Sequence, residues 1–376
     1  MALSRIDTTN MIEDVPQSKI DNNINFRNII INGSMDIAQR GTSATGLTNG
    51  NSGYHTCDRW KFSEGGAPSF QFTQTQSTDV PTGQGFATSL KMDCTTAQGS
   101  LAAADNLRID QRVEGQNLQY LKKGTSSAES LTISFWVKSN KTGTYIVELL
   151  DNDNTRTINK SYTISSTNTW EKKTITYDGD TSGAFDNDNA QSFRCNFFLA
   201  AGTDLTSGSL QTSWGSLTTA NRAVGQVNLA DSTSNEWYIT GVQLEAGEVA
   251  SDFEFLPVDV NERRCQRYFY NWVSSAGQTY SNLAHNILNN QAYGCFVLPV
   301  LMRANPTLIT NGTASHYGSW QGGSQLTCSV VPAMDIAHPQ TPFLYWTYSG
   351  TPLTVAGTTM CRIINTSAFL SFNAEI

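Results

Sequence analysis

The stretch LTISFWVK, residues 131–138, alternates apolar and polar side chains with the two-residue period of a β-strand. One face would carry Leu131, Ile133, Phe135 and Val137, and the other would carry Thr132, Ser134, Trp136 and Lys138. A strand of this kind buries one side in a core and leaves the other side more polar. It predicts an antiparallel sheet packed on one face.

The composition of the whole chain agrees with this strand. Only 15% of the 376 residues are charged, against about 25% in a typical soluble domain. Ser, Thr and Asn together contribute 112 residues, and 29 more are Gly. Thr favours pleated surfaces, while Asn, Ser and Gly favour tight turns. The composition therefore predicts an all-β protein.

Further segments have the length and pattern of strands. TYIVELL, residues 144–150, follows a turn-like linker at 140–143 and is expected to form a hairpin with 131–138. Other predicted strands lie at 170–177, 193–200, 236–245, 265–272, 294–302, 342–348 and 368–376. Short helices are expected at 114–123 and, after Pro257, at 259–265.

These elements predict three parts. Residues 1–28 are polar and are expected to be an extended arm, residues 29–256 a β-sandwich, and residues 257–376 a smaller β domain that begins with a short helical connector. The second domain contains no Lys, since the last one is Lys173. Neutral polar and aromatic residues are left to form its surface.

Charge and hydropathy exclude several classes of protein. A net charge of −8 without a basic cluster argues against nucleic-acid binding. No apolar run reaches the roughly 20 residues that cross a bilayer, and the first 30 residues lack a signal-peptide pattern. We therefore expect a soluble protein made in the cytoplasm. The seven Cys residues are widely spaced without a CxxC pair and are expected to be buried thiols.

A series of segments, in this order, resembles a bacteriophage family of tail-fibre and other virion structural proteins. These segments are NIIINGSMDIAQRGTS from Asn28, GYHTCDRW, LRIDQRVEGQNL, LTISFWVKSN, EWYITGVQLEAGEVASDFEFLPVDVNERRCQRYFY and FVLPVLMRANPT. The resemblance implies a jelly-roll sandwich similar to carbohydrate-binding modules, followed by a C-terminal β domain. It also implies a homotrimer whose residues 1–28 attach to other virion proteins.

No motif for a catalytic nucleophile, a zinc protease or a nucleotide-binding loop occurs in the chain. The four His residues are scattered, so no catalytic residue is predicted. A glycosidase would need two facing carboxylates. The acidic residues available for such a pair include Asp105, Asp110, Glu114, Asp151, Asp153 and Asp186. No cofactor is expected.

One stretch resembles the start of a calcium loop, because Asp178, Asp180 and Ser182 place oxygen donors at alternate positions before Gly183. The twelfth position of a calcium loop normally carries a Glu that binds the ion with both oxygens. In this chain that position is Asn189. A solvated acidic turn is the expected interpretation, and a calcium site is the alternative.

Aromatic and basic residues supply two further candidates. Trp60, Trp136, Trp170 and Trp237 lie in predicted strands or in the DRW motif and are expected to pack in or on the sheets. His316, Tyr317 and Trp320 lie in a turn-rich stretch, where they could contact a ligand. Arg263, Arg264 and Arg267 are candidates for a subunit or domain contact.

The leading hypothesis is a non-enzymatic phage virion protein, a short tail fibre or fibre-like appendage that contacts a host-surface glycan. It would be located in the virion, without membrane insertion. The alternative is a head-decoration, cement or neck protein that clamps virion subunits together. A polysaccharide-degrading enzyme is a minor alternative.

Overall fold

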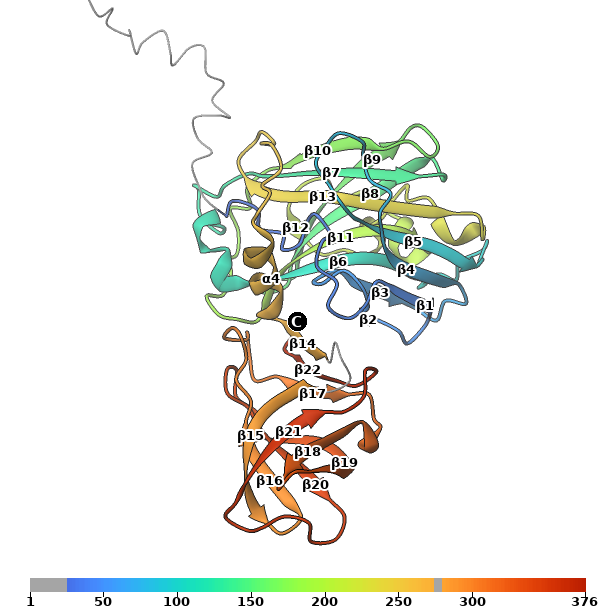
Figure 1. The fold of residues 1–376 in the computed structure, drawn as a ribbon. Coiled ribbons are helices and arrows are strands. Elements are labelled where there is room, and N and C mark those ends of the chain that lie inside the picture. Colours follow the sequence, from blue (N-terminus) through green and yellow to red (C-terminus); the bar gives the residue numbers. More distant parts are fainter. Residues whose placement is uncertain (1–25, 274–278) are drawn as a thin grey trace, which may run out of the picture. The chain divides into compact units, whose positions relative to one another are not determined.

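The computed structural model describes residues 26–273 and 279–376. The chain divides into two compact units, with the division between Leu256 and Pro257 (Figure 1). Residues 1–25 of the predicted arm lie outside the described residues. Its last residues are tied to the end of the first unit, because the backbone amides of Phe26 and Asn28 donate to the Glu254 carboxylate at 2.9 and 3.0 Å.

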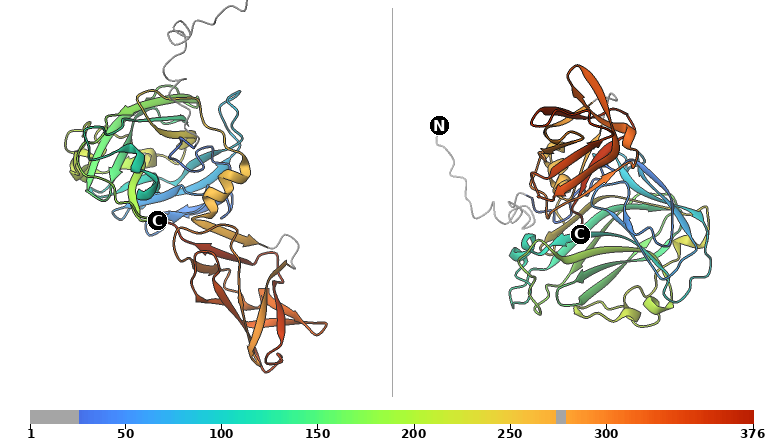
Figure 2. Two further views of the ribbon diagram at one scale, coloured as in Figure 1. Left: turned by 90° about the vertical axis from the view of Figure 1, so that its left-hand side faces the viewer. Right: turned by 90° about the horizontal axis from the view of Figure 1, so that it is seen from below.

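The first unit contains two antiparallel sheets, shown in Figure 1 and Figure 2. The strand order in the first sheet is β1 (Ser43–Leu47), β4 (Gln71–Ser77), β5 (Ser89–Thr96), β13 (Glu236–Ala246), β7 (Leu131–Ser139) and β10 (Glu171–Tyr177). The order in the second sheet is β12 (Gly215–Ser216), β9 (Arg156–Ile164), β8 (Gly143–Asp151), β11 (Gln191–Ala201), β6 (Asn106–Glu114), β3 (Lys61–Gly65) and β2 (Gly53–Tyr54).

The inward faces of the two sheets form one large apolar core. Ile133, Phe135 and Val137 of β7 are fully buried there, as the alternation in 131–138 predicts. Trp60 and Trp237 are fully buried in the same core. Because both sheets bury one face against each other, their outer faces remain to carry polar and aromatic residues. The predicted all-β sandwich is confirmed.

The predicted hairpin of 131–138 with 144–150 is wrong. β7 pairs with β10 and β13 in the first sheet, whereas β8 pairs with β9 and β11 in the second. The linker crosses from one sheet to the other, and Gly143 adopts a φ of 129° that side chains rarely allow. Alternation within each strand cannot reveal which sheet the strand joins.

Helix is scarce in this unit. The predicted helix at 114–123 is replaced by two short 3₁₀ turns, η1 (Gly115–Asn117) and η2 (Gln119–Leu121). The other helical elements are α3 (Thr203–Thr206), η3 (Thr219–Asn221) and η4 (Leu229–Asp231). Part of the segment that carries α3 and η3 covers the outer face of the second sheet, where Leu205 and Ala223 pack on Ile146 and Phe198.

The second unit begins with α4 (Val258–Gln266), which agrees with the helix predicted after Pro257. A small sheet follows, with β14 (Phe269–Val273), β22 (Phe369–Asn373) and β17 (Thr307–Thr310). The remaining strands close into a barrel in the order β15 (Thr279–Leu288), β16 (Gln291–Cys295), β20 (Phe343–Tyr348), β19 (Ser324–Ile336), β18 (Tyr317–Gln321) and β21 (Thr358–Ile363), with η5 (Ala314–His316) before β18.

Two predicted strands of this unit are only partly strand. β16 ends at Cys295, so residues 296–302 of the predicted strand 294–302 form a loop. In 265–272, the first two residues end α4 and the strand begins at Phe269. The apolar run at 296–302 belongs to a loop that buries Phe296, Leu298 and Met302 in the core of this unit and leaves Val297 and Leu301 exposed.

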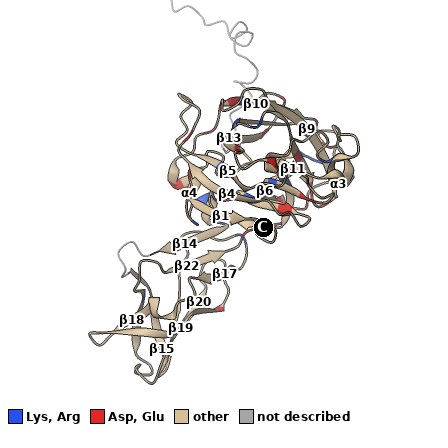
Figure 3. Cartoon of the chain, turned by 90° about the vertical axis from the view of Figure 1, so that its right-hand side faces the viewer, with Lys and Arg blue, Asp and Glu red and all other residues tan. Residues whose placement is uncertain are grey.

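Most charged residues belong to the first unit (Figure 3). Between residues 268 and 376 the charged residues other than His are Arg303, Asp335, Arg362 and Glu375. All seven Cys residues are free, and six of them are buried, as the sequence predicts.

Candidate functional site

A cleft of about 310 Å³ opens on the outer face of the first sheet. Strands β7, β10 and β13 form its floor, and the loops at 83–86 and 252–255 form its walls. The lining residues are Gly83, Gln84, Phe86, Ser134, Trp136, Lys172, Gly241, Asp252, Phe253 and Phe255. Four of the ten are aromatic, which is the composition typical of a small-molecule or saccharide site. We call this site the aromatic cleft.

A bulge in β13 makes room for one wall. The pairing of β13 with β7 shifts register between Thr240 and Gln243, and Gly241 adopts a φ of 62° inside this shift. A Cβ on Gly241 would lie 2.5 Å from Cζ of Phe86. Only glycine therefore lets the Phe86 ring lie on the strand.

Three phenylalanine rings pack together beside this bulge. The Phe253 ring contacts Phe86 edge to face at 5.1 Å and Phe255 at 4.9 Å. Phe86 is almost completely buried by these contacts, whereas 54% of Phe255 is exposed. An aromatic ring held rigidly by two others but left open on one side can bind a ligand without losing much side-chain entropy.

Trp136 contributes a fourth ring from the floor of the cleft. It is half-buried and lies directly opposite Lys172 of β10 on one side and Thr240 of β13 on the other. Gln84, Lys172 and Asp252 are exposed at the rim. The cleft therefore combines flat apolar rings with hydrogen-bond donors and acceptors.

The same sheet face continues into a group of aromatic and charged side chains. The Lys138 ammonium lies 4.3 Å from the Tyr238 ring centre and 5.6 Å from that of Trp170, and it pairs with Asp79. The Trp170 Nε1 donates to Asp79 at 3.0 Å. Although burial alone would raise the pKa of Asp79, its bonds to Lys138 and Trp170 lower it. These contacts hold Lys138 and Trp170 in fixed positions.

The sequence did not identify this cleft. Trp136 was expected to pack on the sheet, although its place among Thr132, Ser134 and Lys138 on the polar face was visible in the alternation. A Trp on the polar side of a strand was thus the available signal. Phe86, Phe253 and Phe255 lie in loops, and no sequence period brings them together.

The three predicted ligand contacts in the second unit differ in their exposure. Tyr317 is fully buried, and its hydroxyl donates to the Phe369 carbonyl at 2.7 Å. His316 is half-buried and hydrogen-bonds Asn311 at 2.7 Å. Trp320 is half-buried, with the Arg362 guanidinium 4.9 Å from its ring centre. Tyr317 is therefore part of the barrel core.

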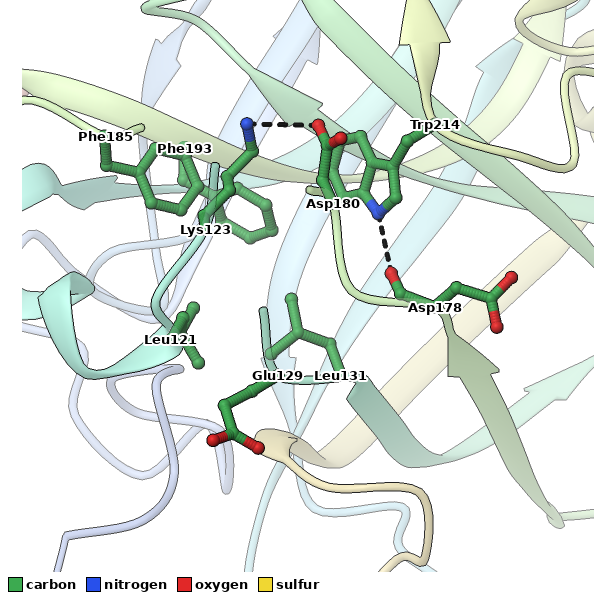
Figure 4. A pocket seen from close by; sticks show the side chains of 9 residues that line it. All are labelled: Leu121, Lys123, Glu129, Leu131, Asp178, Asp180, Phe185, Phe193 and Trp214. Atoms are coloured by element: carbon green, nitrogen blue, oxygen red, sulfur yellow. Dashed lines mark hydrogen bonds and ion pairs between the residues drawn. The ribbon is translucent and has the colours of Figure 1, made fainter. Parts of the chain in front are cut away.

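The side chains of two calcium candidates, Asp178 and Asp180, do not converge on a common point (Figure 4). Asp180 accepts two hydrogen bonds from Arg156, at 2.7 and 2.8 Å, and lies 3.1 Å from the Lys123 ammonium. The side chain of Asp178 points away from it, while the Asp178 carbonyl accepts from Trp214 Nε1 at 2.7 Å. The Asp180 carboxylate is thus neutralised by two cations of the chain itself.

Lys123 is the centre of this network. Its side chain is 5% exposed, and the ammonium donates to Asp151 at 2.5 Å and to the carbonyls of Ser182 and Gly183 at 3.0 and 2.6 Å. Ser182, the third calcium candidate, therefore supplies its carbonyl to a lysine. A buried ammonium with this many acceptors fixes the 178–183 loop against the sandwich.

Other acidic residues considered for a catalytic pair also have structural partners. Asp105 accepts from the backbone amides of Ala67 and Ala102. Asp110 is fully buried and binds Ser63 and Arg112. Among residues 26–273 and 279–376, no group of three or more His, Cys, Asp and Glu side chains is arranged to hold a metal ion.

The three arginines predicted to make a contact lie on or just after α4. Arg263 is exposed, whereas Arg264 and Arg267 are half-buried. Arg267 is the C-cap of the helix, where its backbone amide donates to the Arg263 carbonyl at 3.2 Å. The Arg267 carbonyl accepts from the Arg303 amide at 2.7 Å. Their role between subunits or domains stays a prediction. In the described part of the chain, no helix has the length and apolar character needed to cross a membrane.

The chain matches no family model and no curated protein sequence. Among solved structures, it is similar to the enzymatically active domain of tailspike protein 4 of bacteriophage CBA120, with 16% identity and a TM-score of 0.32 over 58% of this chain and 21% of that one. The chain thus spans about a fifth of that tailspike.

Two carbohydrate-binding modules are also similar. TmCBM61 in complex with β-1,4-galactotriose has 8% identity and a TM-score of 0.29, over 58% of this chain and 99% of the module. The family 11 module from Clostridium thermocellum in complex with a β-1,3-1,4-mixed-linked tetrasaccharide has 11% identity and a TM-score of 0.27, over 56% and 99%. At these identities and TM-scores, none of them identifies a ligand or an activity for this chain.

Proposed function

We propose that this protein is a non-enzymatic phage virion protein, a short tail fibre or fibre-like appendage, that binds a host-surface glycan in the aromatic cleft. The observation that carries the binding proposal is the cleft itself, where Trp136 and Phe255 present partly exposed rings beside polar groups. A sugar ring has an apolar C–H face and a rim of hydroxyls, and it needs both kinds of partner.

The polar groups of the cleft suit a neutral or weakly charged saccharide. Gln84 and Asp252 lie on the walls, and Lys172 lies on the floor strand opposite Trp136. The exposed amide, carboxylate and ammonium groups can exchange water for sugar hydroxyls with little loss of hydrogen bonding. The placement of the protein in a virion is supported by the sequence segments that resemble virion proteins.

A homotrimer is part of this proposal, and the surface of the second unit supports self-association. Of the 17 large hydrophobic residues that are exposed in the described chain, 13 belong to this unit, although it is the smaller one. Leu283 of β15 is 69% exposed and lies directly opposite Met360 of β21, which is 39% exposed. Apolar surface of this extent with few charges is typical of a subunit interface.

The same surface favours the second candidate function, a decoration, cement or neck protein, because such proteins also work by packing against neighbouring subunits. The two candidates differ in what the aromatic cleft does. Purified full-length protein should bind host cells or their isolated surface polysaccharide, and antibodies to it should block phage adsorption. Absence of both effects would remove the glycan-binding role and leave the structural one.

A further inference from the structure

The outer face of the second sheet carries an unusual concentration of arginine. We use the name arginine face for Arg108 and Arg112 of β6, Arg194 of β11 and Arg222 of the segment after α3. Two carboxylates lie among them, Asp110 of β6 and Glu148 of β8, and both are fully buried. With Glu114 at the end of β6 counted as a third carboxylate, the four guanidinium groups still leave an excess of positive charge at this place, in a chain whose net charge is −8.

The two carboxylates are already engaged. Glu148 accepts two hydrogen bonds from Arg222, at 2.7 and 2.6 Å, and one from Asn196 at 2.7 Å. Asp110 accepts from Ser63 and, at 3.4 Å, from Arg112. Neither of them neutralises Arg108 or Arg194 by direct contact. The excess charge of the face therefore resides on these two residues.

The side chains of Arg108 and Arg194 have no hydrogen bond or ion pair within the described residues. The Nε atom of each is buried without an acceptor, and the residues are only partly exposed. Arg194 also lies directly opposite Arg112 in the pairing of β11 with β6. Like charges in directly opposed positions destabilise a sheet, and unpaired buried donors add to that cost.

The surroundings of the arginine face strengthen the electrostatic interactions of its guanidinium groups. Burial and the repulsion of Arg222 lower the pKa of Arg108 to about 10. The Phe198 ring lies 5.7 Å from the Arg108 guanidinium and 5.6 Å from that of Arg222, and it excludes water from one side. A charge in such surroundings is screened less by salt than a surface charge.

We propose that the arginine face binds an oxyanion through Arg108 and Arg194. Carboxylate, sulfate and phosphate groups are planar or tetrahedral acceptors that match the donor geometry of guanidinium. A bound anion would supply the acceptors that these two side chains lack and would offset the repulsion between Arg194 and Arg112. This site lies on the other sheet from the aromatic cleft, so it is a second binding site that does not depend on the glycan proposed there.

The anion can be free or can belong to an acidic saccharide, and two probes separate these sources. Calorimetric titration of the full-length protein with sodium sulfate tests a free anion, and titration with a galacturonic-acid oligosaccharide tests a saccharide carboxylate. A neutral galactose oligosaccharide serves as the matched probe without charge. We expect at least one of the two anions to bind at low ionic strength, more weakly as salt is added.

Two variants, Arg194→Gln and Arg108→Gln, assign the binding to these residues. Each should lower the affinity for the anion by about tenfold or more, because each removes a charge-assisted hydrogen bond. Lys122→Gln removes one positive charge from an exposed side chain elsewhere and should leave the affinity unchanged. Trp136→Ala in the aromatic cleft should also leave it unchanged, which separates this proposal from the glycan proposal.

The melting temperature of the protein without anion is a second measurement that tests the proposal. Arg194→Gln removes a like-charge pair, so its melting temperature without anion should equal or exceed that of the wild type, and sulfate should raise it less. A wild-type protein that binds neither anion would overturn the proposal. The proposal would also be overturned if Arg108→Gln and Arg194→Gln both bound the anion with the affinity of the wild type.

Discussion

Gly241 and Phe86 are matched to each other, because a methyl group at position 241 would lie 2.5 Å from Cζ of the Phe86 ring. The bulge in β13 and the wall of the aromatic cleft are therefore one feature. The absence of a side chain at Gly241 lets the Phe86 ring lie on the sheet, although Phe86 belongs to a loop 155 positions earlier in the chain.

The first prediction concerns this contact. Gly241→Ala should lower the free energy of unfolding for two reasons. Alanine at a positive φ costs about 1–2 kcal/mol, and displacement of the Phe86 ring costs about 1–3 kcal/mol more. Gly46→Ala is the matched control, because Gly46 has a similar φ of 69° with no atom within 4 Å of its Cβ position. Urea unfolding measures the loss of stability in both variants. Equal losses in the two variants would contradict the contact.

The second prediction concerns the buried lysine. Lys123→Met leaves the carboxylates of Asp151 and Asp180 without their ammonium partner. Because breaking a buried ion pair leaves an uncompensated charge, the free energy of unfolding should fall by about 3–5 kcal/mol. The neighbouring Lys122 pairs with Glu129 at an exposed site, so Lys122→Met should cost at most about 1 kcal/mol. Similar melting temperatures for the two variants would refute the structural role of Lys123.

The third prediction is a pH dependence that arises from Glu148. Burial alone would raise its pKa, but the hydrogen bonds and charge of Arg222 and the charge of Arg108 lower it overall. The folded pKa is below the unfolded value of about 4.3, so the contribution to stability is complete above that value. It is lost as the pH falls through the folded pKa.

Glu148→Gln isolates this contribution. The difference in unfolding free energy between wild type and variant should be largest near pH 7 and should shrink as the pH is lowered below about 4. Asp153→Asn, at an exposed carboxylate of the same unit, should show a much smaller difference. A Glu148→Gln difference that is constant from pH 7 to pH 3 would argue against a charged Glu148 in the folded protein.

The fourth prediction concerns the apolar surface of the barrel. If Leu283 and Met360 lie in a trimer interface, the double variant Leu283→Asp, Met360→Asp should sediment as a monomer at concentrations where the wild type is a trimer. Thr327→Asp, at an exposed polar position of β19, should keep the wild-type mass. A monomeric wild type at micromolar concentration would contradict the trimer.

The sequence allowed the fold class and many elements to be predicted, because alternation and turn chemistry are local. The strand at 131–138, the helix after Pro257 and the burial of Trp60 and Trp237 follow from such local signals. The sheet that each strand joins depends on contacts across the whole unit, which is why 131–138 and 144–150 were paired wrongly.

The candidate sites depended even more on distant contacts. Phe86 and Phe253 contact each other across 167 positions of sequence, and the arginine face combines strands β6 and β11 with Arg222 of a later loop. Conversely, Tyr317 and Asp180 were plausible ligand contacts by residue type, but their side chains are committed to the Phe369 carbonyl and to Arg156.

The most direct test of the account is the affinity of the full-length protein for purified host-surface polysaccharide, measured with wild type, Trp136→Ala and Tyr120→Ala. Tyr120 is an exposed aromatic residue outside the cleft and serves as the control. We predict that wild type and Tyr120→Ala bind equally and that Trp136→Ala, still folded, binds about tenfold more weakly or not at all. Equal binding by all three proteins would contradict a glycan site in the aromatic cleft.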